Sequence, residues 1–119
     1  MAPDESPLDL EILDENAEIG VEGLRELIDM YLAQADEILA NLQVAIQTGA
    51  ASDVENLAHK LAGSSAVCGV NVMVPPLQTL AQQGREGRLS DADQLLAQMT
   101  ERLELSRRLL AEYLAEKEP

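Results

Sequence analysis

Phenylalanine and tryptophan are missing from this chain of 119 residues, and two tyrosines are its only aromatic side chains. Aliphatic side chains must therefore fill the core, and leucine occurs 20 times. Sustained alternation of apolar and polar residues, which marks half-buried strands, is also missing, whereas apolar residues recur at spacings of three and four. The sequence predicts an all-α protein with a core of leucine and alanine.

Cys68 is the only cysteine and His59 the only histidine. One cysteine cannot form an internal disulfide, and one histidine with one cysteine cannot complete a closed metal site. A single thiol fits a reducing compartment, and neither a secretory signal nor an apolar run long enough to cross a bilayer is visible. We expect a cytoplasmic protein that needs no disulfide or metal ion to fold.

Positive charge is scarce, because 8 lysines and arginines face 22 acidic residues and give a formal net charge of −14. Nucleic acids and anionic membranes bind cationic surfaces, so both are excluded as partners. Twelve of the acids lie in the first 37 residues, whereas residues 56–85 contain none. This acid-free window includes His59, with Lys60 and Arg85 as its bases. The absence of acids leaves little local repulsion for an anion that approaches His59, but burial of residues 56–85 in a helical core would explain that absence equally well.

Helical periodicity and turn residues predict five helices, which cover residues 6–19, about 21–47, 52–67, 74–86 and 91 onward. Short loops between the last four favour an antiparallel four-helix bundle with a short additional N-terminal helix. We expect one domain over residues 1–119, frayed at residues 1–6 and 116–119, and a monomer.

Capping chemistry assigns three of the predicted starts to serines: Ser6 followed by Pro7, Ser52 in a capping box with Glu55, and Ser90. The double proline at 75 and 76 fits only the first turn of a helix, so we expect the fourth helix to be shortened or displaced.

A lone histidine is commonly a hydrogen-bonded core residue, but the helical wheel places His59 elsewhere. At about 100° per residue, His59 lies about 160° from Leu61, which marks the leucine face. Ala62, Gly63 and Ala66 share the outer face with it. Glycine inside a helix costs about 1 kcal/mol relative to alanine, and clearance for another molecule beside the imidazole accounts for that cost.

Histidine ordinarily titrates near the pH of the cytoplasm, so a fraction of it is neutral and nucleophilic there. A neutral imidazole attacks phosphorus and becomes a good leaving group once protonated, which suits it to carrying a phosphoryl group. Acyl-transfer chemistry would instead need a serine or cysteine beside the ring. Ser64 and Ser65 point away from His59 on the same predicted helix, so a hydrolase is excluded.

The segment LAHKLAGSSAVCGV, residues 57–70, resembles the signature of histidine-containing phosphotransfer (HPt) domains, commonly His-x-Leu-Lys-Gly-Ser-Ser/Ala. The likeness extends to PLDLEIL, to the long predicted helix and to EGRLSDADQLLAQM, and so covers most of the chain. It implies a four-helix bundle that carries the phosphoacceptor, His59, on an exposed helix face. The resemblance further implies that Gly63 gives access and that Ser64 belongs to the motif.

On this resemblance, phosphoryl groups pass between Nε2 of His59 and aspartates of response-regulator receiver domains, and a hybrid sensor histidine kinase is a further partner. The Mg²⁺ belongs to the receiver, so the carrier has no cofactor and no turnover of its own. We expect the partner surface to centre on His59, Ala62, Gly63 and Ala66, with Lys60 at its rim.

Two positions depart from the family pattern. The lysine usual three residues after the histidine is Ala62 here, and Lys60 points about 100° away from the ring. The polar residue usual at the +22 position is Ala81. Gln78 or Gln82 is the candidate to bond Nδ1 of the imidazole in its place.

A non-phosphorylated helical adaptor that docks a signalling partner through the same face remains the alternative. The phosphoacceptor region of a sensor kinase fits less well, because such regions carry an acid directly after the histidine, where this chain has Lys60.

Replacing Ala62 by lysine should lengthen the lifetime of phosphohistidine, because a cation beside the phosphoryl dianion contributes up to about 1 kcal/mol at an exposed site. Loss of acid-labile label with time measures that lifetime. An unchanged or shorter lifetime in Ala62→Lys would contradict the prediction.

Overall fold

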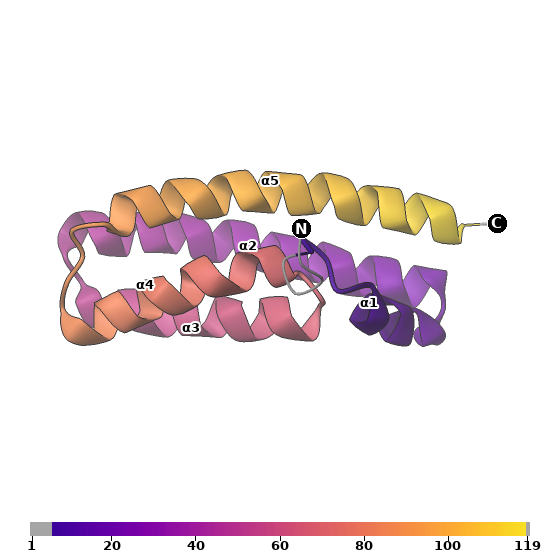
Figure 1. The fold of residues 1–119 in the computed structure, drawn as a ribbon, viewed down its shortest axis with the longest axis horizontal. Coiled ribbons are helices and arrows are strands. Elements are labelled where there is room, and N and C mark those ends of the chain that lie inside the picture. Colours follow the sequence, from indigo (N-terminus) through magenta and orange to yellow (C-terminus); the bar gives the residue numbers. More distant parts are fainter. Residues whose placement is uncertain (1–5, 119) are drawn as a thin grey trace.

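The computed structural model describes residues 6–118, and all regular elements among them are helical. In chain order they are α1 (Leu10–Asn16), the 3-10 turn η2 (Ala17–Ile19), α2 (Val21–Thr48), α3 (Ala51–Val67), the 3-10 turn η3 (Asn71–Met73), α4 (Val74–Glu86) and α5 (Ala92–Lys117). Helices α2 to α5 alternate in direction, and α5 packs back against α2 (Figure 1). The predicted all-α antiparallel four-helix bundle with a short N-terminal helix is confirmed.

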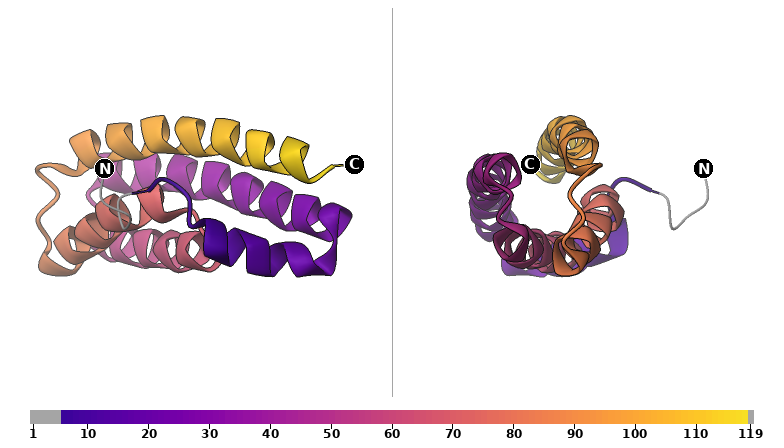
Figure 2. Two further views of the ribbon diagram at one scale, coloured as in Figure 1. Left: turned by 45° about the vertical axis from the view of Figure 1, so that its right-hand side comes forward. Right: turned by 90° about the vertical axis from the view of Figure 1, so that its left-hand side faces the viewer.

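Helices α2 and α5 run the length of the molecule, whereas α3 and α4 form a shorter pair over part of it (Figure 1). Seen along the long axis, the four helices surround a common centre (Figure 2). Helix α1 lies beyond the end of α3, and η2 connects it to α2 (Figure 1). Two backbone bonds hold the start of the chain there: Asp9 N–H donates to Gly69 O at 2.7 Å, and Val72 N–H donates to Pro7 O at 3.1 Å.

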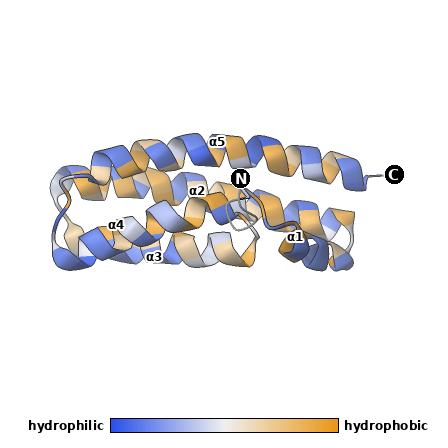
Figure 3. Ribbon diagram, viewed as in Figure 1, coloured by the Kyte–Doolittle hydropathy of each residue, from blue (hydrophilic) through white to orange (hydrophobic). Residues whose placement is uncertain are grey.

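The core lies between the four bundle helices and consists almost wholly of aliphatic residues. Its largest fully buried side chains are Leu13, Leu24, Leu42, Val54, Leu61, Val70, Met73, Leu77, Leu80, Met99 and Leu110. Hydrophobic and hydrophilic residues alternate along each ribbon, as expected of helices that bury one side (Figure 3). Burial of each such leucine or methionine favours the folded state by about 1.5–3 kcal/mol.

The predicted bounds of two helices agree closely with the structure. Helix α2 ends at Gly49, whose φ of +71° lies in the left-handed region that favours glycine. Helix α4 covers Val74–Glu86 as predicted, and both prolines lie in its first turn. With 13 residues, α4 is the shortest helix of the bundle, because Pro75 and Pro76 cannot lie further inside it.

The predicted serine caps are wrong at all three helices. Helix α1 begins at Leu10, where Asp9 Oδ1 accepts the N–H of Ile12 at 3.2 Å, so Ser6 and Pro7 precede the helix. Only Gly49 and Ala50 separate α2 from α3, and Ala50 O already accepts the N–H of Val54. This tight connection starts α3 early and leaves Ser52 inside the first turn, without the capping box.

Helix α5 also differs from expectation at both ends. Asp91 takes the cap position that was predicted for Ser90, with no side-chain capping bond, because the turn closes from Ala92 N–H to Leu89 O at 3.1 Å. The helix continues to Lys117, so residues 116 and 117 are helical where fraying was expected. Of the remaining residues expected to fray, 1–5 and 119 lie outside the described residues.

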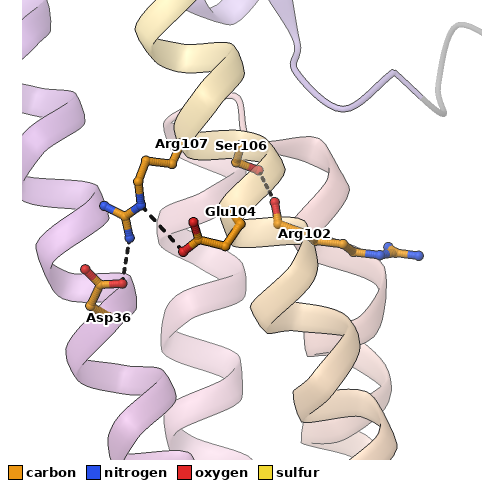
Figure 4. Close-up of polar contacts among 5 residues, drawn as sticks. All are labelled: Asp36, Arg102, Glu104, Ser106 and Arg107. Carbon is orange, nitrogen blue, oxygen red and sulfur yellow. Dashed lines mark hydrogen bonds and ion pairs between the residues drawn. The ribbon is translucent and has the colours of Figure 1, made fainter.

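Polar contacts hold α5 on two sides. The Arg107 guanidinium donates to Asp36 of α2 at 2.7 Å and lies 3.8 Å from Glu104, while Arg102 points to the other side of α5 (Figure 4). There Arg102 donates to the carbonyl of Val72 at 2.8 Å and fixes the turn before α4.

Asp14 ties α1 to the end of α5. Its carboxylate accepts a hydrogen bond from the Tyr113 hydroxyl at 2.5 Å and lies 3.3 Å from Lys117 Nζ. The hydrogen bond from Tyr113, followed by the contact with Lys117, lowers the pKa of Asp14. The Asp14 carboxylate therefore stays ionised, and keeps its contacts with α5, to a lower pH than an unpaired aspartate would.

Helices α3 and α4 approach each other closely at Gly84 of α4. A Cβ at this position would lie 2.7 Å from the Glu55 nitrogen and 2.8 Å from the Ala51 oxygen, both backbone atoms of α3. Backbone atoms cannot rotate aside as a side chain can, so glycine is required where the two helices touch.

Gly84→Ala should destabilise the protein by about 1–3 kcal/mol, because the added methyl forces α4 away from α3. Urea unfolding monitored by circular dichroism measures the change. Gly63→Ala is the matched control, since its added Cβ meets nothing within 4 Å and it also lies inside a helix. Equal stability of Gly84→Ala and Gly63→Ala would contradict the contact between the two helices at this position.

Candidate functional site

His59 projects from the middle of α3 into solvent. The flanking residues Ala58 and Leu61 are fully buried, whereas His59 and Lys60 are exposed. The outward position that the helical wheel predicts for the imidazole is therefore what the structure shows. A ring in this position is open to a second molecule.

A groove of about 310 Å³ between α3 and α4 contains this imidazole. Seven residues line it: His59 and Ala62 from α3, and Gln78, Ala81, Gln82, Arg85 and Glu86 from α4. We call it the α3–α4 groove. The groove therefore brings together the imidazole, which is a potential nucleophile, the two glutamine amides and the arginine guanidinium.

Ala62 does not lie on the exposed face that the wheel predicts. Its side chain is 8% exposed, because α4 packs over that flank of α3 and turns Ala62 into part of the groove floor. A wheel with one inner and one outer face could not show this, since α3 is covered by α2 on one side and α4 on the other. Of the residues predicted to form the partner surface beside His59, Lys60, Gly63 and Ala66 are therefore the exposed ones.

Gln78 and Gln82, the two predicted hydrogen-bond partners of the imidazole, are both exposed and both line the α3–α4 groove. Among the described residues no hydrogen bond joins either amide to His59, so this role stays a prediction. Ala81, at the +22 position, is buried beneath them at 6% exposure.

The remaining predicted residues lie around the histidine without forming a single cluster. Gly63 and Ser64 line a second groove, between α2 and α3. Ala66 lines a third, against Leu8 and Pro75. Lys60 is exposed between them and lines none of the three.

This second groove, the α2–α3 groove, was not predicted from the sequence. It has a volume of about 420 Å³ and is lined by Leu27, Met30, Tyr31, Gln34, Gly63, Ser64, Val67 and Cys68. Met30 and Val67 are 71% and 69% exposed, which is unusual for large apolar side chains. The signal in the sequence was that both lie off the apolar stripes of their helices.

A buried hydrogen bond supports the floor of the α2–α3 groove. The hydroxyls of Tyr31 and Ser65 lie 2.6 Å apart, and Ser65 is fully buried. Burial raises the pKa of Tyr31 to about 12, so its hydroxyl stays neutral and keeps this bond. The pair joins α2 to α3 six residues after His59 and fixes the rotation of the histidine-bearing helix.

Arg85 lines the same groove as His59, although from the sequence it was named only as one base of the acid-free window. Its Nε donates to Glu55 Oε2 at 2.7 Å, and this bond raises the pKa of Arg85. At the groove rim Glu86 pairs with Arg88, and that hydrogen bond lowers the pKa of Glu86. Each carboxylate beside the α3–α4 groove thus has an arginine partner.

Neither a metal site nor a membrane span emerges from the part of the chain that is described. No group of three or more His, Cys, Asp or Glu side chains is placed to hold a metal ion within residues 6–118. No helix in this range is both long enough and apolar enough to cross a bilayer.

The chain thus forms an antiparallel helical bundle that presents one histidine in a groove between two helices. The family model described as Hpt domain matches residues 26–112, and the chain belongs to this family. Its role is accordingly phosphotransfer in two-component signalling.

Among solved structures, the chain is similar to histidine-containing phosphotransfer protein B (HptB) from Pseudomonas aeruginosa PAO1. The two share 25% sequence identity with a TM-score of 0.87, over 94% of this chain and 97% of that chain. No curated protein matches the sequence significantly.

Gly63 should matter for partner access and not for packing. Because a Cβ there meets nothing within 4 Å, Gly63→Ala should stabilise the protein by about 1 kcal/mol, the helix propensity gained. Gly63→Met should leave the fold intact and slow phosphotransfer with a receiver by about tenfold or more, because its side chain occupies the approach to His59. Rapid-quench labelling measures the rate, and an unchanged rate in Gly63→Met would refute the access role.

Proposed function

We propose that this protein is a phosphorelay intermediate in which His59 accepts a phosphoryl group from an aspartate of one receiver domain and donates it to an aspartate of another. The observation that carries the proposal is the exposed imidazole in the α3–α4 groove of an Hpt-family bundle. A hybrid sensor histidine kinase would supply the first receiver.

The transfer needs only one nucleophile from this chain. The lone pair of His59 Nε2 attacks the phosphorus of the aspartyl phosphate, the N–P bond forms as the P–O bond breaks, and the aspartate leaves as a carboxylate. Nδ1 keeps its hydrogen during attack and bears the positive charge that makes the ring a good leaving group for the next transfer. The receiver brings the Mg²⁺, so the carrier holds no cofactor and has no turnover of its own.

The two grooves on either side of α3 support a receiver as the docking partner. The α2–α3 groove offers apolar contact through Met30 and Val67, and the α3–α4 groove offers the histidine and polar side chains. An interface with an apolar patch beside a polar one is typical of specific, transient complexes. We further propose that the protein is a monomer, since most of its apolar side chains are buried within one chain, and that it acts in the cytoplasm.

Incubating the protein with phosphorylated receiver domains tests the proposal. The wild type should acquire label that is labile to acid and stable to base, and His59→Gln should fall to background because no other residue of the groove replaces the nucleophile. Mass spectrometry of the labelled protein places the group on His59.

The control is the thermal melt of His59→Gln, which should match the wild type because substitutions of exposed side chains usually change stability little. A helical adaptor without phosphotransfer chemistry would bind the receiver equally well in both proteins and take up no label. That result from every receiver of a panel would reject the phosphocarrier.

A further inference from the structure

The α3–α4 groove lacks the cation usual in the histidine motif, because position 62 is an alanine at the groove floor. A phosphoryl group on His59 would bring close to two negative charges into this space. Among the described residues that line the groove, Arg85 is the only lysine or arginine. The charge that the motif lacks on α3 is thus available from α4.

Helix packing fixes where Arg85 emerges. Gly84, the preceding residue, touches the backbone of α3 at Ala51 and Glu55, so the start of the Arg85 side chain is held against that part of α3. Glu55 lies four residues before His59, and residues four apart on a helix are neighbours, about 5–6 Å between Cβ atoms. A guanidinium held at Glu55 is therefore adjacent to the imidazole.

The ion pair with Glu55 leaves most of the guanidinium free. Arginine has five N–H donors in a planar fork, and the bond to Glu55 uses only the one on Nε. Among the described residues, the four N–H donors of the two Nη atoms bond nothing further. Their planar arrangement suits the oxygens of a phosphoryl group, which arginine binds through paired hydrogen bonds.

We propose that Arg85 binds the phosphoryl group on His59 in place of the missing lysine, and that Glu55 positions its guanidinium by holding Nε. This inference rests on the proposed function, since it assigns a binding role at the same histidine. Glu55 is a positioning residue, because it acts through Arg85 and not on the phosphoryl group.

Lifetime measurements on phosphorylated protein test the inference without a cognate receiver. Phosphoramidate serves as the donor, because its P–N bond breaks with loss of ammonia as the bond to His59 forms. After the phosphoramidate is removed, the phosphorylated protein is followed by ³¹P NMR. The spectra report the decay of phosphohistidine and the pH midpoint at which the phosphoryl dianion takes up a proton.

Arg85→Gln should shorten the lifetime of phosphohistidine by about fivefold. The effect is modest because solvent screens an ion pair at an exposed site. The substitution should also raise the pH midpoint of the phosphoryl titration, because a nearby cation favours the dianion and its removal favours protonation. Arg108→Gln is the matched control, since it removes the same charge from an exposed position on α5 outside the groove. Both measurements in Arg108→Gln should equal those of the wild type.

Glu55→Ala should change both measurements in the same direction as Arg85→Gln, and the double variant should change them no further than Arg85→Gln alone. A longer lifetime in Glu55→Ala would show that Glu55 competes for Arg85, and would overturn the positioning role. Wild-type values in Arg85→Gln would overturn the phosphoryl-binding role. Failure of the proposed function is separate, because there the wild type itself takes up no label from any receiver.

Discussion

The contact between α3 and α4 at Gly84 sets the geometry of the whole functional face. Since the two backbones meet within van der Waals distance there, the groove beside His59 has a floor of small residues, Ala62 and Ala81, and a wall made by α4. The same contact brings Arg85 to Glu55. A larger residue at position 84 would alter the width of the groove and the place of the guanidinium together.

The charge distribution of the chain has a structural counterpart. The protein is strongly acidic, yet the acid-free window of residues 56–85 contains most of α3 and α4 and therefore both walls of the groove. Glu55 and Glu86 border it, and both are paired with arginines. An incoming phosphoryl group thus meets compensated carboxylates, while the uncompensated acids lie mainly on the first half of the chain.

Much of the fold followed from patterns that act over one or two turns of helix. The spacing of leucines in α2 and the position of the prolines in α4 depend only on local geometry, and the predicted bounds of both helices agree with the structure. The serine caps were wrong because a serine at a helix start is a preference of less than about 2 kcal/mol, which a tight connection such as Gly49–Ala50 overrides.

The site divides in the same way between local and long-range causes. The sequence determined that the fold is helical, that His59 faces outward and that Gly63 leaves space beside it, because these follow from positions along one helix. Only the tertiary structure decided that Ala62 is buried, that Met30 and Val67 border a second groove, and that Arg85 lies near the histidine. Those relations join residues of different helices, and their distances are set by how the helix backbones pack.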